Sequence, residues 1–163
     1  MASGLIFNPI HLLHAAPLAT STATLAHALL ELITNSAFLQ PHIRQQSEPV
    51  LPTWYDQVFG RAVWTVVTLN LSTISAAAAT LLLNRQRRDL QTPVFYWAGM
   101  AGAIGHLMFV PFVAGPVQRI VEAKGEKPES TRDMERWLSV HRVRMLVADL
   151  PAWIAFVGAV LTL

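Results

Sequence analysis

The amino-acid sequence predicts an all-α fold: a four-helix transmembrane bundle with a short amphipathic loop helix. Of the 163 residues, 53% are hydrophobic and only 13% are charged, whereas about a quarter of the residues of a soluble domain are charged. Four stretches are long and apolar enough to cross a hydrocarbon core of about 30 Å, which takes about 20 helical residues. We therefore expect one integral-membrane domain over residues 1–163. The expected spans cover about residues 17–38, 58–83, 93–114 and 138–161.

The composition excludes several classes of site. The chain contains no cysteine, which excludes disulfides, thiolate metal ligands and cysteine nucleophiles. The formal net charge is only +2, and no basic stripe with interleaved aromatic residues is present, so we expect no nucleic-acid partner. Residues 1–13 lack the basic start of a secretory signal, and the first apolar segment is therefore expected to be retained as a span.

The first span is expected to begin near Pro17, after an interfacial or kinked segment at residues 5–14. A loop over residues 41–57 follows; it contains three prolines and ends in a cluster with Trp54 and Tyr55. These two aromatic residues suit the headgroup level of a membrane. We therefore place this loop at a membrane surface.

The second span is expected to end at a charged turn over residues 84–91. The third is expected to end before Gly115 and Pro116, a helix-stopping pair. Residues 117–137 carry five basic and five acidic side chains. They predict a short amphipathic helix, a turn at 125–128, and a new helix capped by Ser130 or Thr131 that continues into the fourth span.

Four spans place both termini on one side of the membrane. Arg44 and the five basic residues of 117–137 make six on the opposite side, against three in the turn at 84–91. By the positive-inside rule, the two longer loops lean toward the cytosol. We expect a multi-pass protein of the endoplasmic reticulum membrane, with the lipid bilayer and a hydrophobic small molecule as its partners.

Ionisable groups lie at comparable depth on all four spans, and such groups are costly in a membrane unless they face the bundle interior. These groups are Glu31, Arg61, His106, Arg142 and Asp149. Arg142 and Asp149 are seven residues apart and share a face of a regular helix, which Trp153 joins four residues later. We therefore expect a polar pocket inside the bundle.

Polar and small residues form stripes with helical spacing on the other three spans. On the first span they are Thr20, Thr24, His27, Glu31 and Asn35. On the second they are Arg61, Thr65, Thr68, Ser72 and Ser75, with Asn70 on the opposite side. On the third they are Gly99, Gly102 and His106. We expect the stripes to converge on the pocket, together with Trp64, Trp97 and Trp153.

No cofactor fingerprint is present, and we expect neither a metal nor an organic cofactor. His27 and Glu31 could bind a metal together with His106, but this spacing is common. Burial favours the protonated form of a carboxyl group and a neighbouring arginine favours the charged form. Two carboxyl groups in one apolar pocket could therefore act as an acid and a base.

Two short segments carry a family resemblance: RWLSVHRVRMLV at residues 136–147, and Trp54, Tyr55, Gly60 and Arg61 before the second span. With the span layout, they resemble small four-span membrane proteins of fungal polyketide gene clusters. That group includes the anthrone oxygenase-like family and the membrane hydrolases or epoxidase-like proteins of polyene-pyrone pathways such as those of citreoviridin and aurovertin. The resemblance implies an enzyme of fungal secondary metabolism that needs no metal or organic cofactor.

Paired acids favour the opening of an epoxide in a hydrophobic polyene, by hydrolysis or by cyclisation to a cyclic ether. In this hypothesis Asp149 is the general base, Glu31 is the general acid, and His106 or Arg142 orients them. The expected substrate contacts are Trp54, Tyr55, Arg61, Trp97, Trp153, His27 and Asn70.

Two other functions compatible with the sequence are a cofactor-free anthrone oxygenase, in which His106 or His27 deprotonates a phenol, and a non-catalytic membrane scaffold or small transporter. Small residues at positions 98, 101, 102 and 105 would permit close helix contact within a chain or in a homodimer.

Overall fold

The computed structural model describes residues 9–83, 92–123 and 129–162, and these ranges contain helices and turns but no strand. The helices are α1 (Pro9–Ala37), α2 (Arg44–Ser47), α3 (Leu51–Leu83), α4 (Thr92–Met108), α5 (Val110–Glu122), α6 (Ser130–Arg144), the π-helical turn η1 (Met145–Asp149) and α7 (Leu150–Leu161). The predicted all-α class is confirmed. The predicted turns at 84–91 and 125–128 lie outside the described residues, as does the start of the segment at 5–14.

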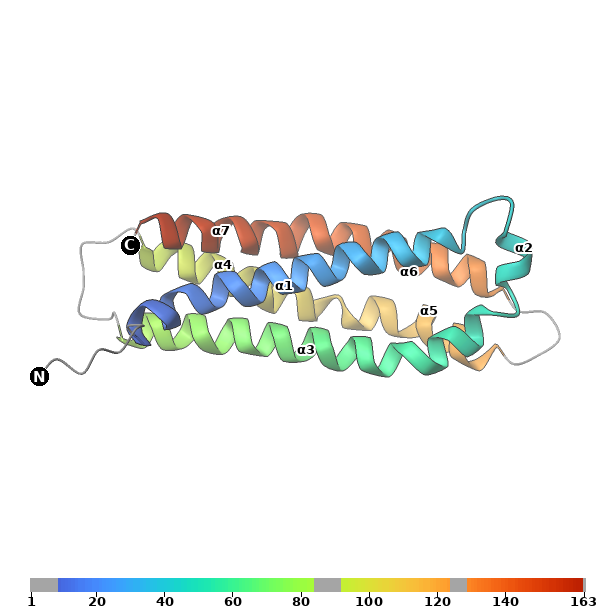
Figure 1. Ribbon diagram of the computed structural model, residues 1–163, viewed down its shortest axis with the longest axis horizontal. Helices are drawn as coiled ribbons and strands as arrows, with labels where there is room; N and C mark the ends of the chain where they lie inside the picture. Colours follow the sequence, from blue (N-terminus) through green and yellow to red (C-terminus); the bar gives the residue numbers. More distant parts are fainter. Residues whose placement is uncertain (1–8, 84–91, 124–128, 163) are drawn as a thin grey trace, which may run out of the picture.

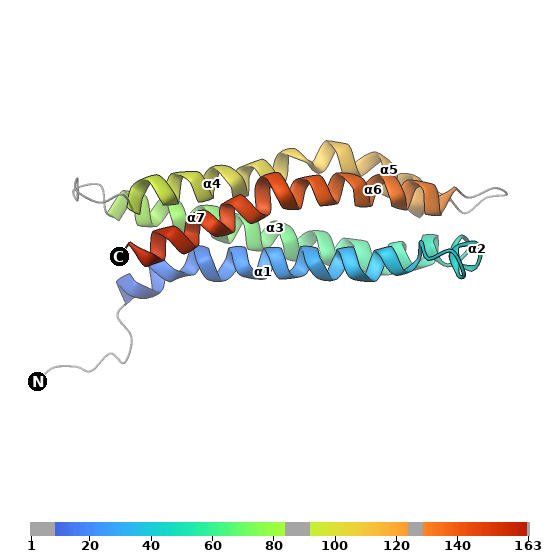
Figure 2. The ribbon, with the colours of Figure 1, turned by 90° about the horizontal axis from the view of Figure 1, so that it is seen from above.

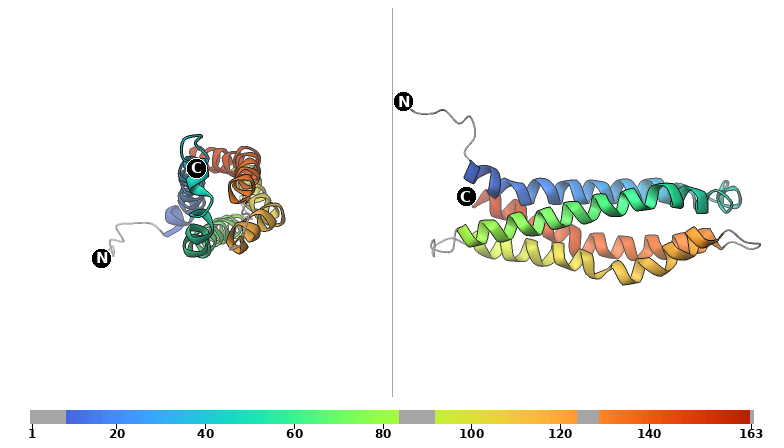
Figure 3. Two further views of the ribbon diagram at one scale, coloured as in Figure 1. Left: turned by 90° about the vertical axis from the view of Figure 1, so that its right-hand side faces the viewer. Right: turned by 90° about the horizontal axis from the view of Figure 1, so that it is seen from below.

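The helices form four long rods that lie side by side (Figure 1). The rods are α1, α3, α4 with α5, and α6 with η1 and α7, and the end-on view in Figure 3 shows them around a common centre. Successive rods run in opposite directions, so the first turn of α1 and the last turn of α7 lie at one end of the bundle (Figure 2). We call this the terminal end and the other, where α2 lies, the α2 end.

Three helical stretches are long and apolar enough to cross a membrane: Leu51–Leu83, Thr92–Glu122 and Ser130–Leu161. The 29-residue helix α1 is not among them. Threonines, histidines and a glutamate along α1 lower its mean hydropathy. These three stretches agree with a membrane location, and the fourth span expected at 17–38 is not confirmed.

The chain after the third expected span differs from the prediction. The helix does not stop before Gly115 and Pro116, because α5 runs through both residues to Glu122. The interruption comes earlier, at Phe109, and Pro111 then lies in the first turn of α5, where its missing N–H would have no helical partner in any case. The predicted amphipathic helix is therefore the second half of α5.

The N-terminus of α6 is capped by a residue far away in the sequence. The backbone N–H groups of Ser130 and Thr131 donate to the carboxylate of Glu48, at 2.9 and 3.3 Å. Neither Ser130 nor Thr131 caps the helix with its own side chain, so that prediction is wrong. A carboxylate at this position also interacts favourably with the helix dipole, and it ties the connection between α2 and α3 to α6.

Close contacts join α4 and α7 near the terminal end. A Cβ atom at Gly99 would lie 2.6 Å from the ring of Phe156, and one at Gly102 would lie 2.7 Å from Ala152 Cβ. The predicted face of Gly99, Gly102 and His106 is confirmed, since the two glycines pack on α7 and η1 and His106 contacts Asp149 of η1. Gly102 is thus used for packing within the chain.

Candidate functional site

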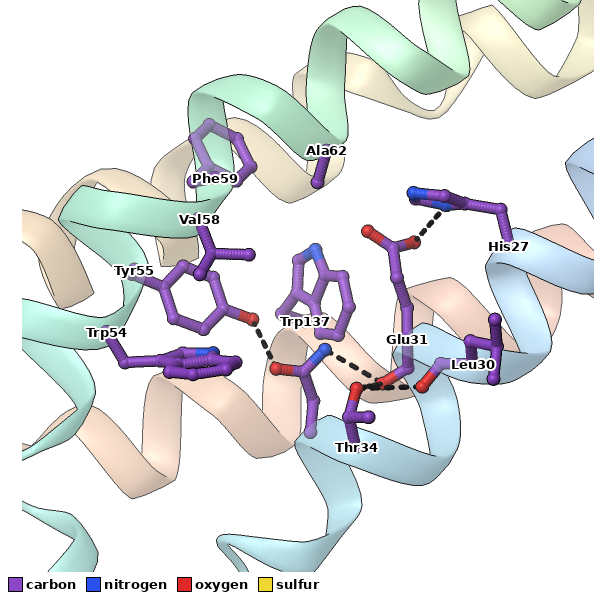
Figure 4. A pocket seen from close by; sticks show the side chains of 11 residues that line it. His27, Leu30, Glu31, Thr34, Trp54, Tyr55, Val58, Phe59, Ala62 and Trp137 are labelled. Atoms are coloured by element: carbon purple, nitrogen blue, oxygen red, sulfur yellow. Dashed lines mark hydrogen bonds and ion pairs between the residues drawn. The ribbon is translucent and has the colours of Figure 1, made fainter.

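A cavity of about 310 Å³ lies between α1, α3 and α6, in the half of the bundle toward the α2 end. Most of its lining is aromatic or aliphatic, and Glu31 is the acidic residue in it (Figure 4). The lining residues are His27, Leu30, Glu31, Thr34, Asn35, Trp54, Tyr55, Val58, Phe59, Ala62 and Trp137. This volume and lining suit a small apolar molecule that meets a few polar groups.

Glu31 lies between two histidines. Its Oε2 atom is 3.6 Å from Nδ1 of His27 and 3.9 Å from Nδ1 of His141. The Glu31 side chain is 22% exposed, whereas His141 is completely buried. The imidazole of His141 also stacks on the indole of Trp137, with ring centroids 4.8 Å apart. A carboxylate with two imidazoles beside it can take up or release a proton at the cavity wall.

His141 is held by hydrogen bonds on both ring nitrogens. Its Nε2 donates to the carbonyl oxygen of Ala28 at 2.8 Å, and its Nδ1 accepts from Nη2 of Arg144 at 2.9 Å. Because an arginine can only donate and a carbonyl can only accept, the network assigns the neutral tautomer with its proton on Nε2. The ring is thereby fixed relative to α1.

Arg144 connects this part of the site to a second carboxylate. Its Nε atom is 3.5 Å from Oδ2 of Asp149, and Oδ1 of Asp149 is 2.6 Å from Nδ1 of His106. Both side chains of the Asp149–His106 pair are only 2% exposed. A continuous series of contacts therefore runs from Glu31 on α1 through His141 and Arg144 to Asp149 and His106 on α4.

The π-helical turn η1 explains why Arg144 faces Asp149. A π turn contains one residue more than an α turn, so the residue five positions before Asp149 lies above it. The prediction assumed a regular helix and chose Arg142, whose side chain is exposed. Arg144 is the buried arginine. Turns of this kind are frequent at functional sites.

The expected aromatic contacts divide into two groups. Trp54 and Tyr55 line the cavity, as does His27. Trp97 is 59% exposed on the outer face of α4, and Trp153 donates from its indole to Thr22 Oγ1 at 2.9 Å instead of entering the cavity. Trp64 is also exposed, at 71%. In an apolar solvent such as lipid, a tryptophan gains nothing by facing inward.

The face of α3 is opposite to the prediction. Asn70 is buried and borders a second cavity of about 10 Å³ beside Asp149. The expected stripe is exposed: Arg61, Thr65, Thr68, Ser72 and Ser75. A hydroxyl in a helix can donate to its own backbone, as Thr65 Oγ1 does to the carbonyl of Arg61 at 2.9 Å, and so needs no partner inside the bundle.

Sequence reasoning missed three buried residues of the site, namely Trp137, His141 and Arg144. Their spacings of four and three residues place them on one helix face, which was the available signal. The metal set suggested by His27, Glu31 and His106 is not brought together, because His106 pairs with Asp149. No group of three or more potential ligands for a metal occurs among the described residues.

Comparisons with known proteins give relatives that match almost end to end. The chain is 30% identical over 158 residues to the epoxidase pydX of Acremonium sp., covering 96% of this chain and 97% of that protein. It is 31% identical over 153 residues to the probable epoxidase scpX of Mollisia scopiformis, covering 93% and 96%. The epoxidase gkaX of Penicillium citrinum is 29% identical over 152 residues, 92% of this chain and 93% of that protein.

No protein-family model matches the chain, so the predicted membership of the anthrone oxygenase-like group gains no support. No solved structure matches it either.

Proposed function

Because the chain belongs to the family of fungal epoxidases that includes pydX and scpX, we propose that it is itself an epoxidase of fungal secondary metabolism. It adds an oxygen atom to a carbon–carbon double bond of an apolar substrate. The similarity to relatives named epoxidases over more than nine-tenths of the chain carries this proposal. The apolar cavity with a carboxylate at its wall supports it.

The reaction needs an oxygen source and a reductant. With molecular oxygen as the source, one atom enters the substrate and the other leaves as water, which consumes two protons and two electrons. We take a reduced nicotinamide, acting through a membrane reductase, as the class of electron donor. Glu31 and His27 face the cavity and are the residues that hold and deliver a proton beside the reacting bond.

Asp149, His106 and Arg144 act as positioning residues. None of them lines the large cavity, so they act on the substrate through Glu31. Arg144 holds the ring of His141 at 2.9 Å, and His141 in turn lies against the Glu31 carboxylate. Asp149, itself paired with His106, contacts Arg144 from the other side.

Opening of an epoxide is the second candidate, and the paired carboxyl groups favour it. Glu31 alone of the two carboxyl groups lines the large cavity, so Glu31 would meet the epoxide oxygen as the acid. Asp149 would then be a remote base, three contacts along the network from Glu31. This separation makes epoxide formation the stronger proposal.

The test is to express the chain in yeast microsomes and to follow products by mass. An apolar polyene is supplied with ¹⁸O₂ and a reduced nicotinamide, and its epoxide is supplied separately in ¹⁸O-labelled water under argon. Label from ¹⁸O₂ in a new epoxide is expected. Label from water, or a cyclised isomer formed without oxygen, would show epoxide opening instead.

Two further outcomes would contradict both reactions. Oxidation of an anthrone but of no polyene would indicate an anthrone oxygenase, and binding or transport of the polyene without chemical change would indicate a scaffold or transporter. Glu31→Gln is expected to abolish label incorporation. Arg142→Gln, on the exposed side of α6, is the matched control and should keep it.

We also propose that the chain is a multi-pass protein of the endoplasmic reticulum. Three stretches that could span a membrane support this, and the fourth crossing requires α1. The test is to insert one glycosylation acceptor before α1 and another between α3 and α4, and to determine on which side of the membrane each lies. Four crossings place these two positions on the same side, whereas three place them on opposite sides if α1 stays outside the bilayer.

A further inference from the structure

Tyr55 presents a poorly satisfied hydroxyl group to the cavity. The residue is 5% exposed, and the nearest acceptors of its hydroxyl are Asn35 Oδ1 and Met134 Sδ, both at 3.4 Å. Hydrogen bonds between two oxygen atoms are normally 2.5–3.0 Å long, and a thioether is a weak acceptor. Figure 4 shows this hydroxyl at the Trp54 side of the cavity. A buried hydroxyl of this kind favours a ligand that accepts a hydrogen bond.

The polar neighbours of Tyr55 are already engaged. Nδ2 of Asn35 donates to the backbone carbonyl of Glu31 at 2.8 Å, and the hydroxyl of Thr34 donates to that of Leu30 at 2.7 Å. The indole N–H of Trp137 has no hydrogen-bond partner among the described residues, and Figure 4 shows its ring nitrogen directed toward the middle of the cavity. Two donors, from Tyr55 and Trp137, are therefore available to one ligand.

We propose that Tyr55 and Trp137 bind a carbonyl oxygen of the substrate. Binding of the carbonyl does not depend on the proposed epoxidase function. Only the position of the reacting double bond relative to the carbonyl rests on that function. The substrate is then an elongated apolar molecule that carries a ketone, ester or amide group. Such a carbonyl accepts two hydrogen bonds and donates none from its oxygen, which matches two donors.

The positions of the lining residues along α1 also indicate the distance between the carbonyl and the reacting double bond. The Tyr55 hydroxyl lies beside Asn35, and Glu31 precedes Asn35 by one helical turn, about 6 Å along α1. The double bond beside Glu31 is therefore about one helical turn from the carbonyl. The aromatic faces of Trp54, Phe59 and Trp137 suit a flat conjugated segment between the two groups.

The test measures binding without requiring turnover. The protein in lipid nanodiscs is titrated with methyl parinarate, a fluorescent tetraene with an ester carbonyl, and with the matching tetraene hydrocarbon. Energy transfer from tryptophan reports binding. Tyr55→Phe should weaken binding of the ester threefold to tenfold, about 0.7–1.4 kcal/mol, as expected for the loss of one neutral hydrogen bond. Binding of the hydrocarbon should not change.

A matched control makes the same chemical change elsewhere. Tyr96 is also buried, but its hydroxyl donates to the carbonyl oxygen of His14 at 2.8 Å, away from the cavity. Tyr96→Phe should change the binding of neither probe. Trp137→Phe removes the second donor and part of the aromatic wall, and it should therefore weaken binding of the ester more than binding of the hydrocarbon.

Equal effects of Tyr55→Phe on both probes, or no effect on either, would overturn the carbonyl proposal, as would the absence of saturable ester binding to the parent protein. Discrimination between the probes without any epoxide formation would leave this inference standing and remove the proposed function. The two can thus fail separately.

Discussion

The two halves of the bundle are packed in opposite ways. Toward the terminal end, α4 and α7 approach so closely that a Cβ at Gly99 or Gly158 would collide with a phenylalanine ring. Toward the α2 end, a cavity of about 310 Å³ lies between α1, α3 and α6. A close-packed interior resists deformation, so the tight half can hold the rods in place while the open half receives a substrate.

The charged network lies where the two halves meet. Gly102 packs on Ala152 and on the backbone of Ala148 within one residue of Asp149, and four residues after Gly102 comes His106. The close packing therefore sets the position of the His106–Asp149 pair. From that pair, Arg144 and His141 extend into the open half. This arrangement suggests that rigidity in one half determines geometry in the other.

The largest expected effect separates the two arginines of α6. Arg144→Met leaves Asp149 buried with His106 alone and should lower the free energy of unfolding by about 3–5 kcal/mol, the usual cost of breaking a buried ion pair. Arg142→Met changes an exposed side chain and should stay within about 0.5 kcal/mol. Thermal unfolding in detergent measures both. Equal losses would show that the network does not depend on Arg144.

A second pair of variants compares tight and open backbone contacts. Gly99→Ala places a methyl group 2.6 Å from the Phe156 ring and should cost about 1–3 kcal/mol of stability through overpacking. Gly60→Ala on α3 meets no atom within 4 Å and should stabilise by about 0.5–1 kcal/mol through helix propensity. The same unfolding assay applies, and a neutral Gly99→Ala would contradict the tight packing of α4 on α7.

Double-mutant cycles compare the buried pair with the pair at the cavity wall. His106→Gln and Asp149→Asn should show a coupling of about 1–3 kcal/mol, because the atoms are 2.6 Å apart and both side chains are buried. His27→Gln and Glu31→Gln should couple by less than about 1 kcal/mol, because they are 3.6 Å apart and each is 22% exposed. A stronger coupling at the cavity wall would reverse the proposed division between positioning and reacting groups.

The smallest effect concerns the α2 end itself. Glu48→Ala removes the acceptor at the N-terminus of α6 and should cost about 1 kcal/mol, as for other lost N-caps. Glu129→Ala removes only the exposed ion pair with Arg132 and should cost less than about 0.5 kcal/mol. A difference in unfolding temperature between the two variants checks this, and identical values would rule out a role for Glu48 as a cap.

Helix positions and the depth of the polar groups followed from the sequence because they depend on hydropathy along one chain. Glu31, His106 and Asp149 do lie in one connected site, and Trp54 and Tyr55 do line the cavity. The face of α3 that lies toward the bundle interior could not be predicted in the same way. The hydroxyl stripe of this helix is exposed, because a threonine that bonds to its own backbone is compatible with either face.

The choice between arginines failed for a different reason. Counting by 3.6 residues per turn is correct only while the helix stays regular. The first four residues of η1, before Asp149, are ordinary apolar residues that do not indicate a π turn. The remote cap by Glu48 could not be predicted either, since it joins residues more than 80 positions apart.

Regarded as a matter of chain length, η1 is a one-residue insertion in the last rod. Deleting one residue between Arg144 and Asp149 would turn the rod into a regular helix and place the arginine four positions before the aspartate, a spacing at which two side chains share one face of an α-helix. Trp137 and His141 would then keep their faces, because the π turn absorbs the extra residue without rotating the helix before it. A homologous chain that lacks this residue would need its arginine four positions before the aspartate to form the same contact.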